Sequence, residues 1–158
     1  TLDRDGMVDL VASWAERYPL VSVEDPLHED DWAGWERLRS RVDAVQILGD
    51  DLLVTDRERL DRAIERDAAT AVLVKPNQAG TISRALDVVT RAREAGLGTV
   101  VSARSGETCD ATIADLAVGL DAGQIKIGSL ARSERLAKYN RMLGIDRAGL
   151  VFAGDRAL

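Results

Sequence analysis

The chain has 158 residues, which is enough for one domain with a buried core. Hydrophobic residues make up 46% and charged residues 30%, a composition typical of a soluble globular protein, and no apolar run of about 18 residues predicts a membrane span. The net charge of -6 argues against nucleic acid as the main partner, because phosphate backbones bind to basic faces. A small anionic substrate stays compatible with this charge, since a few local cations or a metal ion suffice to bind it.

The single cysteine, Cys109, cannot form an internal disulfide, which fits a reducing, cytoplasmic compartment. We interpret it as a small packing residue. The first residues, TLDRDGMVDL, are too acidic for a signal or transit peptide. Because no methionine starts the chain, we expect it to be part of a longer protein.

Predicted helices and strands alternate along the chain. A helical stretch at residues 4–18 comes first, and five apolar segments rich in β-branched residues follow, each succeeded by helical periodicity. The predicted strands are 19–25, 44–51, 70–78, 98–105 and 123–129, and the helices that follow them are 30–42, 55–68, 81–96, 108–120 and 133–143. We expect Thr55 to cap the helix at 55–68. In the helix at 81–96 we expect Ile82, Leu86 and Val89 to lie together on one face.

This alternation predicts an α/β fold of parallel strands that are buried on both faces. One polar residue lies near the end of each strand, namely Glu24, Asp50, Lys75, Arg104 and Lys126. The gaps between them are 26, 25, 29 and 22 residues, a spacing typical of the βα units of a barrel. In such barrels the carboxyl ends of the strands form the active site. A doubly wound open sheet is the alternative, but its first βα turn should carry a glycine-rich phosphate loop, which SVEDPLHEDD lacks. Five strands cannot close an eight-stranded barrel, so we expect the first strands to lie outside this chain.

Carboxylates follow the first two predicted strands. Glu24 and Asp25 follow the first strand, and Asp50 and Asp51 follow the second. A carboxylate at each of two neighbouring strand ends would suit Mg²⁺, because hard cations prefer oxygen ligands that converge from a rigid frame. Solvation of the loops or helix capping is the alternative. His28 is the only histidine, and without a partner motif we expect it at the surface.

Cations follow the later strands. Lys75 and Lys126 lie within apolar strand sequences, and lysine is rarely buried without a task, so Lys75 is a candidate general base. An internal ion-pair network is the alternative. Arg104 and Ser105 offer a guanidinium and a hydroxyl that suit a phosphate, although a plain surface turn remains open.

Five blocks of the sequence together resemble the C-terminal part of enolase, in order and at matching spacing. They are SVEDPL, GDDLLVT, VKPNQAGTISRALD, SARSGETCDATIADLAVG and GQIKIGSLARSERLAKYNRML. The resemblance implies a partial enolase C-terminal barrel domain over residues 1–158, with the N-terminal domain and the first barrel strands absent. It also implies a cytoplasmic, Mg²⁺-dependent lyase of glycolysis that reversibly dehydrates 2-phosphoglycerate to phosphoenolpyruvate, as a homo-oligomer of two or more subunits.

The resemblance further implies roles for single residues. Glu24 and Asp50 would bind Mg²⁺, with Glu24 also beside the substrate, and Lys75 would remove the proton next to the carboxylate. Lys126 would bind the substrate carboxylate. The phosphate contacts would be Arg104 and Ser105. A third metal carboxylate, the acidic residues that help hydroxide leave and the mobile loops would lie outside this chain.

One departure from the family concerns the sequence SARSGET. Enolases read SHRSGET, so Ala103 replaces an active-site histidine. Loss of a positioned donor predicts weaker turnover of the ordinary substrate. It also makes a specialised enzyme plausible, such as one that forms carboxyphosphonoenolpyruvate in the synthesis of phosphonate natural products. A non-catalytic enolase-like binding protein is the third possibility, but a decayed enzyme would not need all five strand-end residues.

Overall fold

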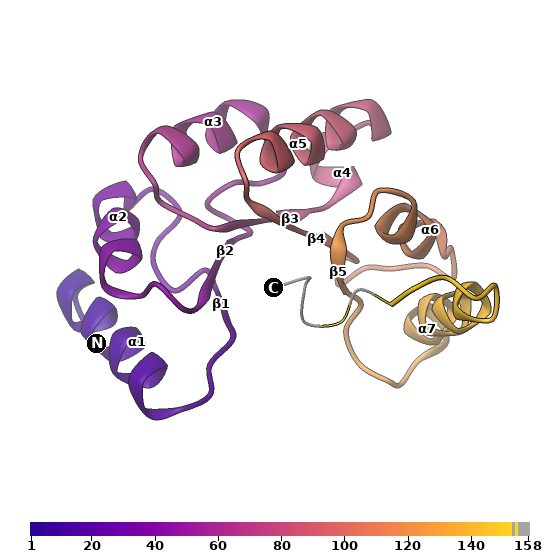
Figure 1. The fold of residues 1–158 in the computed structure, drawn as a ribbon, viewed down its shortest axis with the longest axis horizontal. Coiled ribbons are helices and arrows are strands. Elements are labelled where there is room, and N and C mark those ends of the chain that lie inside the picture. Colours follow the sequence, from indigo (N-terminus) through magenta and orange to yellow (C-terminus); the bar gives the residue numbers. More distant parts are fainter. Residues whose placement is uncertain (153, 155–158) are drawn as a thin grey trace.

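A computed structural model of the chain describes residues 1–152 and 154. Its five parallel strands form one sheet in the order β1-β2-β3-β4-β5, which curls so that the helices line its outer side (Figure 1). The strands are β1 Ser22–Glu24, β2 Gln46–Gly49, β3 Ala71–Val74, β4 Gly98–Ser102 and β5 Gly123–Lys126. The helices are α1 Arg4–Arg17, α2 Trp32–Arg41, α3 Arg57–Glu65, α4 Pro76–Ala79, α5 Ile82–Glu94, α6 Thr112–Gly119 and α7 Ser133–Asp146. The predicted α/β order is confirmed, and the curled parallel sheet fits the predicted part of a βα barrel.

The register of the strands brings their carboxyl ends to one rim of the sheet. Glu24 is level with Leu48, two residues before Asp50. On the other side, Ser102 is level with Lys126. All predicted site residues therefore fall on the same rim, as the barrel interpretation requires.

Alternate residues of the central strands serve two different apolar clusters. Ile47 and Val72 join the main core, which packs the sheet against α1, α2, α3 and α5. The residues of the second cluster, on the opposite face of the sheet, are Leu48, Ala71, Leu73 and Val100. In β4, Val101 belongs to a third cluster with Ala117 and Ala122. Because side chains alternate across a strand, burial of nearly every residue of β2, β3 and β4 means that these strands are covered on both faces.

The two outer strands depart from the predicted burial. The residues of β1 are half-buried or exposed. In β5 the first and last residues are exposed, and the two between them are half-buried. Within the described residues each of these strands pairs on one side only. The expectation of full burial on both faces is therefore wrong for β1 and β5.

Three local expectations are also wrong, two of them fully and the one for α5 in part. Asp56, rather than Thr55, caps α3, because its carboxylate accepts a hydrogen bond from the Arg59 backbone N–H at 3.0 Å. Of the residues predicted to share one face of α5, Val89 is buried and Leu86 is half-buried, whereas Ile82 is 45% exposed; the buried residues of α5 are Ala85, Val88, Val89 and Ala92. Cys109 is exposed and fills no space in the core. His28 is exposed, as expected.

In the described part of the chain, no helix has the length and apolar character needed to cross a membrane.

Candidate active site

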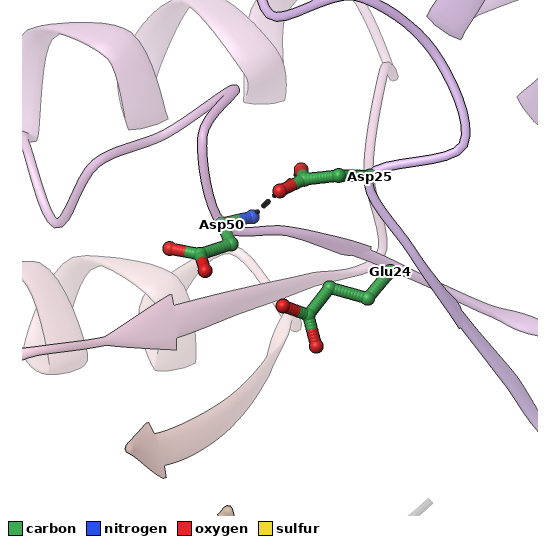
Figure 2. A group of neighbouring side chains, drawn as sticks. All are labelled: Glu24, Asp25 and Asp50. Atoms are coloured by element: carbon green, nitrogen blue, oxygen red, sulfur yellow. Dashed lines mark hydrogen bonds between the residues drawn. The ribbon is translucent and has the colours of Figure 1, made fainter. Parts of the chain in front are cut away.

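Three carboxylates from two neighbouring strand ends converge on one point of the rim. Each of Glu24, Asp25 and Asp50 offers one oxygen, and these oxygens all lie within 4.8 Å of one another. Figure 2 shows Glu24 and Asp25 coming from the end of β1 and Asp50 from the end of β2. The sequence placed Asp25 beside Glu24 after the first strand, but only Glu24 and Asp50 were expected to bind the metal.

Asp25 joins the group through its backbone conformation. Successive residues of a strand point to opposite faces, so Asp25 would ordinarily point away from Glu24. Its φ of 43° leaves the strand conformation, and aspartate tolerates this left-handed region better than most residues. Its carboxylate accepts hydrogen bonds from the backbone N–H groups of Asp50 at 3.0 Å and Asp51 at 2.8 Å. Burial raises the pKa of Asp25, and these two hydrogen bonds oppose the rise only in part.

The carboxylate of Asp50 shows that this group fits a hard cation. Asp50 is 7% exposed, and its Oδ1 atom is buried with no hydrogen-bond partner among the described residues. A buried, unpartnered carboxylate oxygen is costly unless a positive group binds it. Mg²⁺ takes oxygen ligands and is commonly held by one or two carboxylates together with water and substrate. Glu24 and Asp50 could supply those ligands, while Asp25 holds the Asp50 backbone in place.

Two lysines pair with the same carboxylates. Lys75, which follows β3, donates from Nζ to Asp50 Oδ2, and its side chain is only 12% exposed. Lys126, the last residue of β5, donates from Nζ to both carboxylate oxygens of Glu24 at 2.5 and 2.7 Å. The predicted ion-pair network is thus present, and it consists of the same residues as the predicted catalytic group. The two interpretations are compatible, since a divalent cation could take over the carboxylates and release the amines.

A basic cleft of about 360 Å³ adjoins this network. The residues that matter along its wall are Lys75, Ala103, Arg104, Ser105, Lys126 and Arg135. Four of them are cations, and no carboxylate of the described residues lines the cleft. Such a cleft suits a small ligand with more than one negative charge. A larger hollow of about 570 Å³ lies near α3 and α5, where Arg57 is paired with Asp87 at 2.9 Å, and its lining includes none of the predicted site residues.

Ala103 lines the wall of the cleft with only a methyl group. This residue is 8% exposed, and its backbone N–H donates to the carbonyl of Lys126 at 2.9 Å. Its methyl group therefore forms the wall directly between the ends of β4 and β5. A larger side chain at this position would take up part of the cleft.

The turn after Ala103 is held by Glu107. Its carboxylate accepts a hydrogen bond from the Arg104 backbone N–H at 2.7 Å and pairs with Lys138 of α7, also at 2.7 Å. Lys138 is fully buried, and its Nζ atom also donates to the carbonyls of Thr108 and Glu134. The sequence gave no indication of this brace, because it depends on where α7 packs.

A buried threonine holds the backbone of Lys75. Thr55 is 2% exposed, and its Oγ1 atom accepts from the Lys75 backbone N–H at 2.9 Å while donating to Gln78 Oε1 at 2.9 Å. The sequence analysis took Thr55 for a helix cap and so missed its proximity to Lys75.

A family model described as the enolase C-terminal TIM barrel domain matches residues 1–155. The match covers nearly the whole chain and includes every residue of the rim described above. The curled parallel sheet and the convergence of acids and bases on its carboxyl rim are the features that such a barrel requires. The chain therefore belongs to the enolase family, of which it carries the C-terminal TIM barrel domain.

Proposed function

We propose that the chain provides the proton-abstracting and anion-binding part of an enolase-type hydro-lyase, which interconverts 2-phosphoglycerate and phosphoenolpyruvate. The observation that carries this proposal is the joining of a carboxylate group suited to Mg²⁺ with two lysines and a basic cleft on one rim. Lysine occurs at only three positions in the chain, and two of them lie on this rim while Lys138 braces it. The remaining cationic side chains of the chain are arginines, so these two lysines give the rim compact amines that arginine would not provide.

The proposed reaction requires positive charge next to the substrate carboxylate. A proton on the carbon next to a carboxylate is weakly acidic, and its removal places a second negative charge on that carboxylate, which preorganised cations must stabilise. When bound at Glu24 and Asp50, Mg²⁺ would supply much of this charge. Lys126 would bind the substrate carboxylate, Arg104 and Ser105 the phosphate, and the Nζ atom of Lys75 would accept the proton from carbon 2.

The proposal also requires residues of a longer protein that are not among these 158. We expect the first barrel strands, a third metal carboxylate and the acid that assists the departing hydroxide to come from residues beyond these 158. The single-sided pairing of β1 and β5 in the described residues supports this expectation. We also expect a cytoplasmic homo-oligomer, as enolases commonly are.

The test uses the intact protein with 2-phosphoglycerate and Mg²⁺, and follows the appearance of phosphoenolpyruvate. Lys75→Ala should lower kcat by about 10²- to 10⁴-fold, the usual contribution of a positioned general base. Arg84→Ala is the matched control, because Arg84 is an exposed cation of α5. A wild-type protein that neither turns over this substrate nor gains thermal stability from Mg²⁺ would contradict the proposal, and favour a non-catalytic binding role.

Ala103 favours a second candidate reaction. Its methyl group leaves space where the family histidine would stand, so the cleft suits a bulkier relative of the substrate. An enzyme that forms carboxyphosphonoenolpyruvate would use the same elimination chemistry on a phosphonate. If the wild type is inactive on 2-phosphoglycerate and Ala103→His gains activity, this second candidate is favoured, and phosphonate analogues should be assayed next.

A further inference from the structure

We propose that Arg135 is a positioning residue that sets the span of the cleft between its two anion-binding ends, the Arg104–Ser105 turn and Lys126. This inference rests on the proposed function, because it assigns the phosphate and the carboxylate of the substrate to those two ends. Arg135 stands in the first turn of α7, outside every strand end that the sequence pattern singled out.

The guanidinium of Arg135 ties two separate turns together. Its Nη1 atom donates to the carbonyl of Ile127 at 2.9 Å, and its Nη2 atom donates to the carbonyl of Ser105 at 3.0 Å. Ser105 belongs to the turn after β4, and Ile127 directly follows Lys126. One planar group therefore fixes the distance between the proposed phosphate contacts and the proposed carboxylate contact.

The absence of a side chain at Gly128 leaves space for the guanidinium of Arg135. Gly128 has a φ of 105°, which glycine adopts without strain, and a Cβ atom there would lie 3.4 Å from Arg135 Nε and 3.5 Å from Cζ. Tyr139, one helical turn after Arg135, donates from its hydroxyl to the Gly128 carbonyl at 2.6 Å. Two residues on one face of α7 thus hold the segment after β5.

Arg135 also brings charge to the cleft. Both hydrogen bonds go to neutral carbonyls, and no carboxylate of the described residues lies within 4.0 Å of its guanidinium as an ion pair. The residue lines the cleft with its positive charge, and the nearby carboxylate of Glu107 interacts with this charge without forming an ion pair. Lysine at this position would keep the charge, but its single nitrogen lacks the planar fork that bridges two carbonyls.

The experiment compares two ligands of the intact Mg²⁺-loaded protein by calorimetry. Inorganic phosphate engages one end of the cleft only, whereas phosphoglycolate carries a phosphate and a carboxylate and engages both ends. Arg135→Lys should weaken phosphoglycolate about tenfold, the loss expected when a two-point charged contact is misplaced, and phosphate less than about twofold. Arg135→Gln, which also removes the charge, should weaken both ligands. Arg132→Lys is the matched control, since the Arg132 side chain is 73% exposed.

The outcomes separate the inference from the proposed function. Equal weakening of both ligands in Arg135→Lys, or no weakening of either, would overturn the positioning role. A variant that misfolds would lose affinity for both ligands together with thermal stability, which also counts against a selective role. A wild type that binds phosphoglycolate in this Arg135-dependent way but does not turn over 2-phosphoglycerate would leave the inference standing and overturn the proposed reaction.

Discussion

Glu107 joins the anion-binding turn to α7 through a partly buried ion pair. Burial alone would raise the pKa of its carboxyl group, but the hydrogen bonds from Lys138 and from the Arg104 backbone outweigh it and hold the pKa below the ordinary value of 4.5. A carboxyl group whose pKa is lower in the folded state stabilises the fold above its unfolded pKa. That contribution is lost as the pH falls through the folded pKa.

We therefore expect acid to loosen this turn, and Glu107→Gln to change the response. The variant lacks the carboxylate at every pH, so its stability near pH 7 should fall, while its loss of stability below about pH 4.5 should be shallower than that of the wild type. Thermal melting of the intact protein at a series of pH values measures both effects. Glu29→Gln is the control at an exposed position. Parallel curves for Glu107→Gln and the wild type would show that the pair contributes nothing.

Among single residues, the sequence predicts those of the rim that directly follow a strand, and it does not predict those whose role depends on tertiary packing. Parallel strands end at one rim, so Glu24, Asp50, Lys75 and Lys126 follow from the position of a polar residue after an apolar run. Arg135 does not follow, because its contribution depends on the packing of α7, which no local pattern encodes. The missed role of Asp25 likewise depends on a φ of 43° at the exit of β1.

At the scale of an element, the turn between β2 and α3 carries backbone strain next to Lys75. Val54 and Thr55 are β-branched and have φ values of 42° and 53°, a region that such residues rarely adopt. A strain of this kind costs on the order of 1–3 kcal/mol for each residue and persists only where surrounding contacts enforce it. Here Leu52 and Leu53 are fully buried, and the Thr55 hydroxyl is held between Lys75 and Gln78.

Thr55→Val should test this turn, because valine has a similar shape but no hydroxyl. The Lys75 N–H and the Gln78 side chain would lose a partner in a buried place, so we expect a loss of about 1–3 kcal/mol in the free energy of unfolding. Thr55→Ser should recover most of it, and Thr90→Val on the exposed side of α5 is the control. Chemical denaturation of the intact protein gives the comparison. Equal stability of Thr55→Val and the wild type would mean that the hydroxyl does not hold the turn.

The order of elements was predictable from period and composition, but their limits were not. The predicted strand at 70–78 ends at Val74, because Pro76 begins the short helix α4 at a position where its missing N–H costs nothing. The predicted burial of all five strands holds only for the central three. A strand's second face is covered by neighbours that the strand's own sequence does not specify.

Across the whole molecule, the charge of the cleft is opposite in sign to the net charge of the chain. The chain has a net charge of -6, yet four cations and no carboxylate of the described residues line the cleft. The acids of the rim stand instead beside the cleft, where Asp50 holds Lys75 and Glu24 holds Lys126. The same two lysines therefore pair with the carboxylates that could hold a cation and line the cleft that could hold an anion.

This arrangement predicts that Mg²⁺ and an anionic ligand bind cooperatively. A cation at Asp50 and Glu24 would displace the amines of Lys75 and Lys126, both of which line the cleft, and so leave them to an anion. Coupling free energies of this kind are about 1–3 kcal/mol, so Mg²⁺ should strengthen phosphoglycolate binding about 5- to 150-fold, and phosphoglycolate should strengthen Mg²⁺ binding by the same factor.

Calorimetry of the intact protein with each ligand, in the absence and presence of the other, gives two independent measurements of this factor. Asp50→Asn should abolish the coupling because it weakens both the cation site and the hold on Lys75, whereas Asp43→Asn, at an exposed aspartate before β2, should leave it unchanged. Affinity for phosphoglycolate that is the same with and without Mg²⁺ would show that the lysines are not shared between the two sites.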